Sequence, residues 1–161
     1  MKTNKLYLYG TILLMLILPT LSILNEFVHS QQNTSLISLI GKWFIFWAIG
    51  IRFLTAGLRQ AFNPAFTAET IFNFKDKESF VIIRELGFAN ICTGIAAIVS
   101  IMIPQWRVVI AFTGGLFLGI AGFNHIIRKP DNPNELIPMI SDIFVFLIMA
   151  LYLTNYIMIG K

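Results

Sequence analysis

The chain has 161 residues, of which 57% are hydrophobic and only 12% charged, and its mean hydropathy is +0.76. A water-soluble domain of this length cannot bury so much apolar surface, so the composition indicates a single membrane domain over residues 1–161. The formal charge of +4 does not indicate a nucleic-acid partner, because the Lys and Arg residues are scattered among apolar segments.

Five stretches are apolar and long enough to cross about 30 Å of hydrocarbon as α-helices. Each must be helical, because hydrocarbon offers no partner for backbone N–H and C=O groups. The sequence therefore predicts an all-α, polytopic transmembrane helix bundle, with a four-helix core and an added N-terminal transmembrane helix. The predicted spans are 6–24, 41–61, 80–103, 108–127 and 136–159.

The first stretch also fits a secretory signal, since Lys2 and Lys5 precede an apolar run. The run is long and no Ala-x-Ala site follows it, so we expect a retained helix. Cleavage would leave the orientation of the other four helices unchanged.

The segment 65–79 mixes aromatic and aliphatic residues with charged ones. This pattern fits a segment that lies on the membrane surface. An ordinary loop with a few anchoring aromatic residues fits it equally well.

Orientation follows from the distribution of Lys and Arg between the two sides of the membrane. Eight lie on one side and three on the other, which places the N-terminus in the cytoplasm, the C-terminus outside, and the protein in the cell inner (plasma) membrane. The larger group is Lys2, Lys5, Arg59, Lys75, Lys77, Arg84, Arg128 and Lys129, and the smaller is Lys42, Arg107 and Lys161.

With this topology most of the polar residues within the spans fall in the cytoplasmic half. An ionisable group at the bilayer centre costs on the order of 3 kcal/mol, so we expect residues such as Arg52 and Asp142 to face the bundle and find partners. Arg52 is the deepest cation, near the middle of its helix. The candidate ligand-binding residues are Arg52, Arg59, Arg84, Glu85, Asn90, Asn124, His125 and Asp142.

Arg52, Thr55, Ala56 and Arg59 follow one helical stripe, so both arginines should lie on the same face. Glu85 and Asp142 are the carboxylates within the predicted spans, and we expect Arg52, Arg59 and Arg84 to share them in a buried network. Such a network either only locks helices together or forms a site for an anionic or quinone-like head group.

A stripe of small residues, Gly115, Gly119 and Gly122, continues into His125. Such stripes allow close approach of helices, so His125 should point toward another helix. It is either a hydrogen-bonded packing residue or a proton relay or ligand contact. No catalytic or metal-binding motif is present, and the single cysteine, Cys92, excludes an intrachain disulfide.

The block Arg84-Glu85-Leu86-Gly87-Phe88-Ala89-Asn90 and the Gly-rich segment ending Asn124-His125 resemble a family of small uncharacterised bacterial membrane proteins. More distantly, the four-helix core is similar to DoxX-like membrane proteins. The resemblance implies a four-helix core of unassigned function. Some DoxX-like proteins are associated with quinone or thiol redox chemistry, but this chain lacks the paired cysteines of a thiol role.

We therefore expect an integral membrane protein that binds a quinone, lipid or other small anionic molecule in the cytoplasmic half of the bundle. The alternative is a non-catalytic scaffolding or accessory subunit, in which the same residues hold helices together. A transporter is disfavoured, because the outer half offers no polar path. The expected partners are the lipid bilayer and either a small-molecule ligand or another membrane protein. The sequence identifies no cofactor and does not indicate an enzyme.

Overall fold

The computed structural model describes residues 3–29, 35–74, 76–130 and 133–159, and five of its helices are long and apolar enough to cross a membrane. The first span, Lys5–His29, consists of α1 (Lys5–Ile12), a π-helical turn η1 (Leu13–Ile17) and α2 (Leu18–His29). The second, Leu36–Phe62, consists of α3 (Leu36–Phe44), η2 (Ile45–Ile51) and α4 (Arg52–Phe62). The other elements are η3 (Phe66–Ile71), α5 (Ser79–Val99), α6 (Trp106–Arg128) and α7 (Pro133–Ile159). The predicted all-α helix bundle is confirmed.

The outward faces of the helices are strongly apolar. Ile82, Val109, Ile120 and Leu147 are each about 60% exposed or more, with values of 72, 61, 63 and 59%. Exposed apolar surface of this extent would drive aggregation in water and is the normal state of a surface in contact with lipid. The chain is therefore a multi-pass membrane protein.

Several helices extend beyond the apolar windows seen in the sequence. The first span continues to His29, and α7 begins at Pro133, which suits the first turn of a helix because proline has no N–H to leave unpaired. The hydropathy of the sequence indicates only the apolar part of each helix, whereas the helix itself continues through polar turns beyond the hydrocarbon. Glu26 and Glu135 consequently lie within helices, and the expectation that Glu85 and Asp142 are the carboxylates of the spans was wrong.

Glycines bring the helices together in two close pairs. In the α4–α5 pair, a Cβ on Gly57 would lie 2.6 Å from the carbonyl oxygen of Gly87, and one on Gly94 would lie 2.6 Å from the backbone nitrogen of Leu54. In the α6–α7 pair, a Cβ on Gly119 would lie 2.7 Å from the ring of Phe146. The predicted packing role of the α6 glycine stripe is confirmed.

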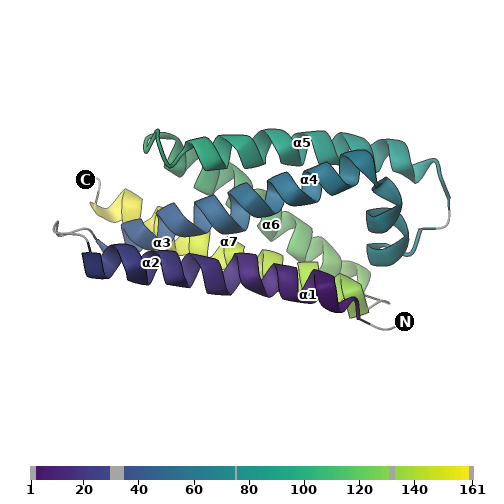
Figure 1. The fold of residues 1–161 in the computed structure, drawn as a ribbon, viewed down its shortest axis with the longest axis horizontal. Helices are drawn as coiled ribbons and strands as arrows, with labels where there is room; N and C mark the ends of the chain where they lie inside the picture. Colours follow the sequence, from purple (N-terminus) through teal and green to yellow (C-terminus); the bar gives the residue numbers. More distant parts are fainter. Residues whose placement is uncertain (1–2, 30–34, 75, 131–132, 160–161) are drawn as a thin grey trace.

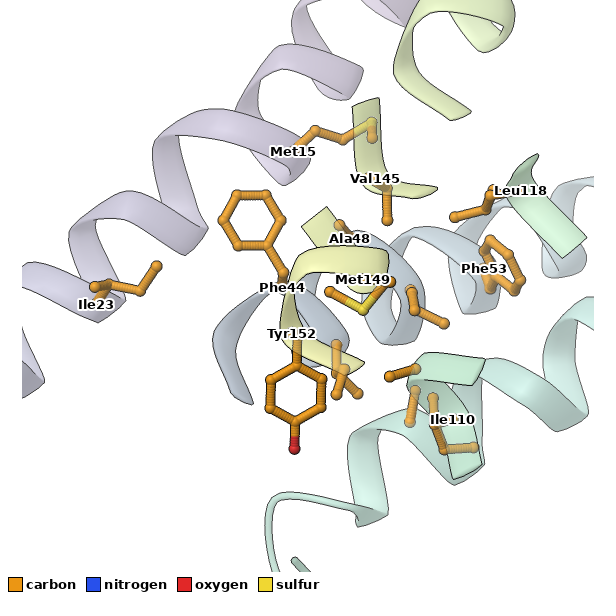
Figure 2. Packing of buried hydrophobic residues seen from close by; sticks show 14 of the residues in the cluster. Met15, Ile23, Phe44, Ala48, Phe53, Ile110, Leu118, Val145, Met149 and Tyr152 are labelled. Carbon is orange, nitrogen blue, oxygen red and sulfur yellow. The ribbon is translucent and has the colours of Figure 1, made fainter. Parts of the chain in front are cut away.

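The hydrophobic core occupies the middle of the bundle and its C-terminal end, where Ile45, Val145 and Met149 are fully buried. Phe44, Met149 and Tyr152 lie close together there (Figure 2). Toward the opposite end, where the first span begins and the second ends, α1 diverges from α4 and α5 diverges from α6 (Figure 1). We call this the N-terminal end of the bundle, and it contains the candidate site.

The segment between the second span and α5 folds back onto the N-terminal end of the bundle. It begins with η3, in which Thr67, Ala68 and Ile71 are buried. It thus forms a packed helical turn and not an open loop. Of the predicted segment 65–79, residue Lys75 lies outside the described residues.

Candidate functional site

A cavity of about 460 Å³ lies at the N-terminal end of the bundle, a size typical of small-molecule sites. It is lined by residues of α1, η1, α4, α5, α6, α7 and η3. The apolar part of its lining includes Leu6, Leu14, Phe53, Leu86, Phe117 and Leu118. The polar part consists of Tyr7, Thr11, Arg52, Thr55, Arg59, Gln60, Thr67, Asn90, His125 and Asp142.

The deepest charges in this lining form an ion pair between α4 and α7. Arg52 Nη2 donates to Asp142 Oδ1 at 2.5 Å and to Ser141 Oγ at 3.1 Å. The Arg52 and Asp142 side chains are only 14% and 7% exposed. Because the π-helical turn η2 ends directly before Arg52, the arginine lies where the second span changes its helical pitch, a feature often found at functional sites.

The other terminal nitrogen of the Arg52 guanidinium, Nη1, has no hydrogen-bond acceptor among the described residues. In the part of the chain that the structure describes, Arg52 Nη1 is the buried side-chain nitrogen without a hydrogen-bond acceptor. A buried donor that remains unpaired costs about 1–3 kcal/mol, and more when it is charged. A folded protein tolerates such an atom where a water, an ion or a ligand completes it.

Arg59 adds a second cation to the same lining, about two helical turns from Arg52. Its guanidinium lies 4.3 Å from the ring centre of Phe66 in η3. Among the described residues it forms no ion pair with a carboxylate, whereas Arg52 does. The lining of Arg52, Arg59 and Asp142 therefore carries one positive charge in excess. The prediction that both arginines share one face of the helix is confirmed, since both line the cavity.

An amide pair joins α4 to α5 beside these charges. Asn90 Nδ2 donates to Gln60 Oε1 at 2.8 Å, and both side chains are buried. Each amide keeps further donor or acceptor capacity after this bond. The pair thus offers the cavity neutral hydrogen-bonding groups.

His125 and Glu135 form a buried pair at the margin of the cavity. His125 Nδ1 lies 2.9 Å from Glu135 Oε1, and the side chains are 7% and 6% exposed. The ring of Phe72 stacks on His125 with centroids 5.8 Å apart. The prediction that His125 points toward another helix is confirmed, because its partner lies on α7.

The structure brings together five of the eight predicted site residues. Arg52, Arg59, Asn90, His125 and Asp142 all line the cavity.

Arg84, Glu85 and Asn124 instead lie on the outer surface of the bundle. The buried face of α5 is the stripe Ile83, Gly87, Asn90 and Gly94, and Arg84 and Glu85 are rotated away from it. Asn124 precedes the buried His125 and points outward for the same reason. The expected network of three arginines with two shared carboxylates is therefore wrong, and only its Arg52–Asp142 part is present.

Three participants were missed in the sequence. Gln60 is an amide within a predicted span, and its polarity was a usable signal. Glu135 fell just outside the predicted fifth span. Tyr7 lies at the start of the first predicted span, and nothing in the neighbouring sequence indicates that α1 lines a cavity.

The comparisons with known proteins identify a family but no activity. The family described as "Family of unknown function (DUF6790)" matches residues 9–157. No curated protein and no solved structure matches the chain.

Proposed function

Since the chain belongs to the DUF6790 family of unknown function, we propose a function from the cavity itself: the protein binds a small amphipathic molecule. The ligand is a quinone, a lipid or another small anionic molecule, with its head group against Arg52 and Arg59. The observation that carries this proposal is the buried Arg52 Nη1 atom without an acceptor in the lining of a cavity of about 460 Å³.

Charge supports an oxygen-rich head group. Asp142 balances Arg52, and Arg59 remains in excess. A carbonyl or anionic oxygen would accept from Nη1, and a negative charge would also interact with Arg59. Hydrogen bonds to charged groups contribute about 1.5–3 kcal/mol each, so these two contacts would dominate affinity.

The apolar lining supports a ligand body without charge. Leu14, Phe53, Phe117 and Leu118 surround the polar groups with aliphatic and aromatic surface. A small hydrophilic anion would leave this surface uncovered, whereas a quinone ring or hydrocarbon chain would cover it. The distant resemblance to DoxX-like proteins agrees with a quinone, and that resemblance remains a prediction.

We further propose that the cavity lies in the cytoplasmic half of the inner membrane. Among the described residues, Lys5, Arg59, Lys77, Arg84, Arg128 and Lys129 belong to the N-terminal end, and Lys42 and Arg107 to the other. Lys2, Lys75 and Lys161 lie outside the described residues. Fusing a reporter that is fluorescent only in the cytoplasm to either terminus tests this orientation: signal from the C-terminal fusion alone would reverse it.

Binding can be tested with a matched pair of arginine variants. The purified protein would be titrated with decylubiquinone, oleate or phosphatidylglycerol, with thermal stabilisation and native mass spectrometry as readouts. Arg59→Gln should weaken binding about 10- to 100-fold, the equivalent of one charge-assisted hydrogen bond. Arg84→Gln removes an arginine of α5 that lies outside the cavity, and it should leave binding unchanged.

The same experiment addresses the scaffolding alternative, which the Arg52–Asp142 pair between α4 and α7 favours. If no probe stabilises the wild-type protein, the polar cluster only holds helices together. Equal loss in Arg59→Gln and Arg84→Gln would show surface attraction of anions and would also contradict the proposed site.

A further inference from the structure

We infer that the ligand is a membrane lipid with an acidic head group and a hydrocarbon chain, and that it enters sideways between α1 and α4. This inference rests on the proposed function and specifies its ligand class. It follows from where the cavity is open and where it is closed.

The first two spans form a V that is held at its narrow end. Glu26 accepts hydrogen bonds from Lys42 Nζ and Trp43 Nε1, each at 2.7 Å, and Trp47 Nε1 donates to Ser22 Oγ at 3.0 Å. These contacts join α2 to α3 and η2. Toward the N-terminal end the two spans separate, and α1 lies well apart from α4 (Figure 1).

The cavity fills the wide end of this V. Gly10 and Thr11 of α1 line it on one side, and Thr55 and Arg59 of α4 line it on the other. Leu6 is 77% exposed, and both Thr55 and Arg59 are exposed. The cavity therefore reaches the outer surface of the bundle between two helices, beside Leu6 and Thr55, which belong to the first two predicted apolar spans.

The helix α1 is not packed into the core along this opening. Among the residues that the structure describes, α1 has no buried residue, whereas its continuation buries Met15, Pro19 and Ile23 against the core. A Cβ added to Gly10 would meet no atom within 4 Å. At every other glycine that the structure describes, an added Cβ would lie within 4 Å of an atom of a neighbouring residue. Gly10 thus leaves space toward the cavity and does not serve helix packing.

The route along the bundle axis is covered by aromatic residues. The Phe66 ring contacts Tyr7 of α1 at 6.1 Å between centroids and the Arg59 guanidinium at 4.3 Å, so it spans the end of the V. Phe72 stacks on His125 beside it. A ligand arriving from water would have to displace this packed turn, whereas a ligand arriving from the bilayer would not.

The order of chemistry along the opening matches a lipid. The Arg52 guanidinium lies within, Arg59 lies at the opening on α4, and Leu6 of α1 and Leu14 of η1 line the cavity from the first span. A phosphate or carboxylate would contact the arginines while its chain remains in contact with these leucines and with surrounding lipid. A water-soluble anion has no group to cover the leucines.

The source of the ligand can be tested with one head group in two forms. The full chain would be placed in phosphatidylcholine nanodiscs that contain phosphatidylglycerol, or in phosphatidylcholine nanodiscs with glycerol phosphate in the buffer. Native mass spectrometry should find bound phosphatidylglycerol in the first arm and at least tenfold less glycerol phosphate in the second. Equal binding of glycerol phosphate would overturn lateral entry but leave the proposed function intact. Binding in neither arm would refute an acidic-lipid ligand, and retention of decylubiquinone would then still support the proposed function.

The entrance is tested by filling it. Gly10→Phe should reduce bound phosphatidylglycerol at least tenfold without lowering thermal stability, because the added ring enters open space. Ile12→Phe is the matched control, since Ile12 lies on α1 outside the cavity lining, and it should retain the lipid. Thr55→Phe closes the opening from α4 and gives a second, independent test. Undiminished lipid in both Gly10→Phe and Thr55→Phe would overturn the inference.

Discussion

Replacing Asp142 by Asn is the sharpest perturbation of the buried ion pair. The substitution keeps the shape of the side chain but removes its charge. Arg52 then keeps its charge, with Nη1 unpaired and Nη2 bonded only to neutral oxygens. Because the Asp142 side chain is only 7% exposed, neither another carboxylate of the described residues nor bulk solvent compensates the charge of Arg52 once the Asp142 charge is lost.

The expected effect is large. Removing one partner of a buried pair costs about 3–5 kcal/mol, which lowers the folding equilibrium constant about 10²- to 10⁴-fold. Replacing both partners with apolar residues, Arg52→Leu with Asp142→Leu, should be far less damaging, because no isolated charge remains. The difference between these variants separates the unpaired charge from simple loss of packing.

Equilibrium unfolding in mixed micelles of dodecyl maltoside and dodecyl sulfate measures these free energies. The single and double variants would be compared with the wild type at one pH and ionic strength. A free energy of unfolding for Asp142→Asn within 1 kcal/mol of wild type would refute the reasoning, because the pair would then be either open to water or absent. A double variant less stable than Asp142→Asn would refute it equally.

Three further outcomes are expected. Gly57→Val should destabilise the α4–α5 pair by about 1–3 kcal/mol in the same unfolding assay, whereas Gly10→Ala should be neutral. Phe72→Ala should increase the modification rate of His125 by diethyl pyrocarbonate, because the stacked ring that covers it is lost. Glu26→Gln should lower stability by only about 1 kcal/mol, because this carboxylate is 28% exposed and water screens its ion pair.

Each of these has a contradicting result. A neutral Gly57→Val variant would mean that α4 and α5 do not approach as closely as described. An unchanged His125 modification rate would mean that the Phe72 ring does not cover His125. A loss above 3 kcal/mol in Glu26→Gln would show that the narrow end of the V is more buried than the exposure of Glu26 indicates.

The number of spans and their helical nature could be predicted because both depend on local properties. A run of about 20 apolar residues is sufficient to identify a membrane helix, since no other backbone conformation satisfies its own hydrogen bonds there. The shared face of Arg52 and Arg59 follows from helical periodicity alone. The glycine stripe of α6 likewise predicted a close helix contact, which α7 provides.

Membership of the site was predicted only in part, because polarity does not determine which face of a helix is buried. Arg84 and Asn90 lie on one helix, yet only Asn90 faces the cavity, since the glycines beside it pack against α4. Both are polar residues of a span, and nothing in their immediate sequence separates them. The rotation of α5 about its axis is decided by its fit to its neighbour.

The sequence by itself determined that this is a helical membrane protein with polar residues concentrated toward one end, because hydropathy and periodicity are properties of each segment alone. Only the tertiary structure decided that the first span stands away from α4, that Arg52 pairs with Asp142, and that η3 covers the end of the bundle. These features depend on contacts between residues far apart in the chain. The glycines draw the helices into two tight pairs, α4 with α5 and α6 with α7. The cavity is the space that remains between these two pairs and α1.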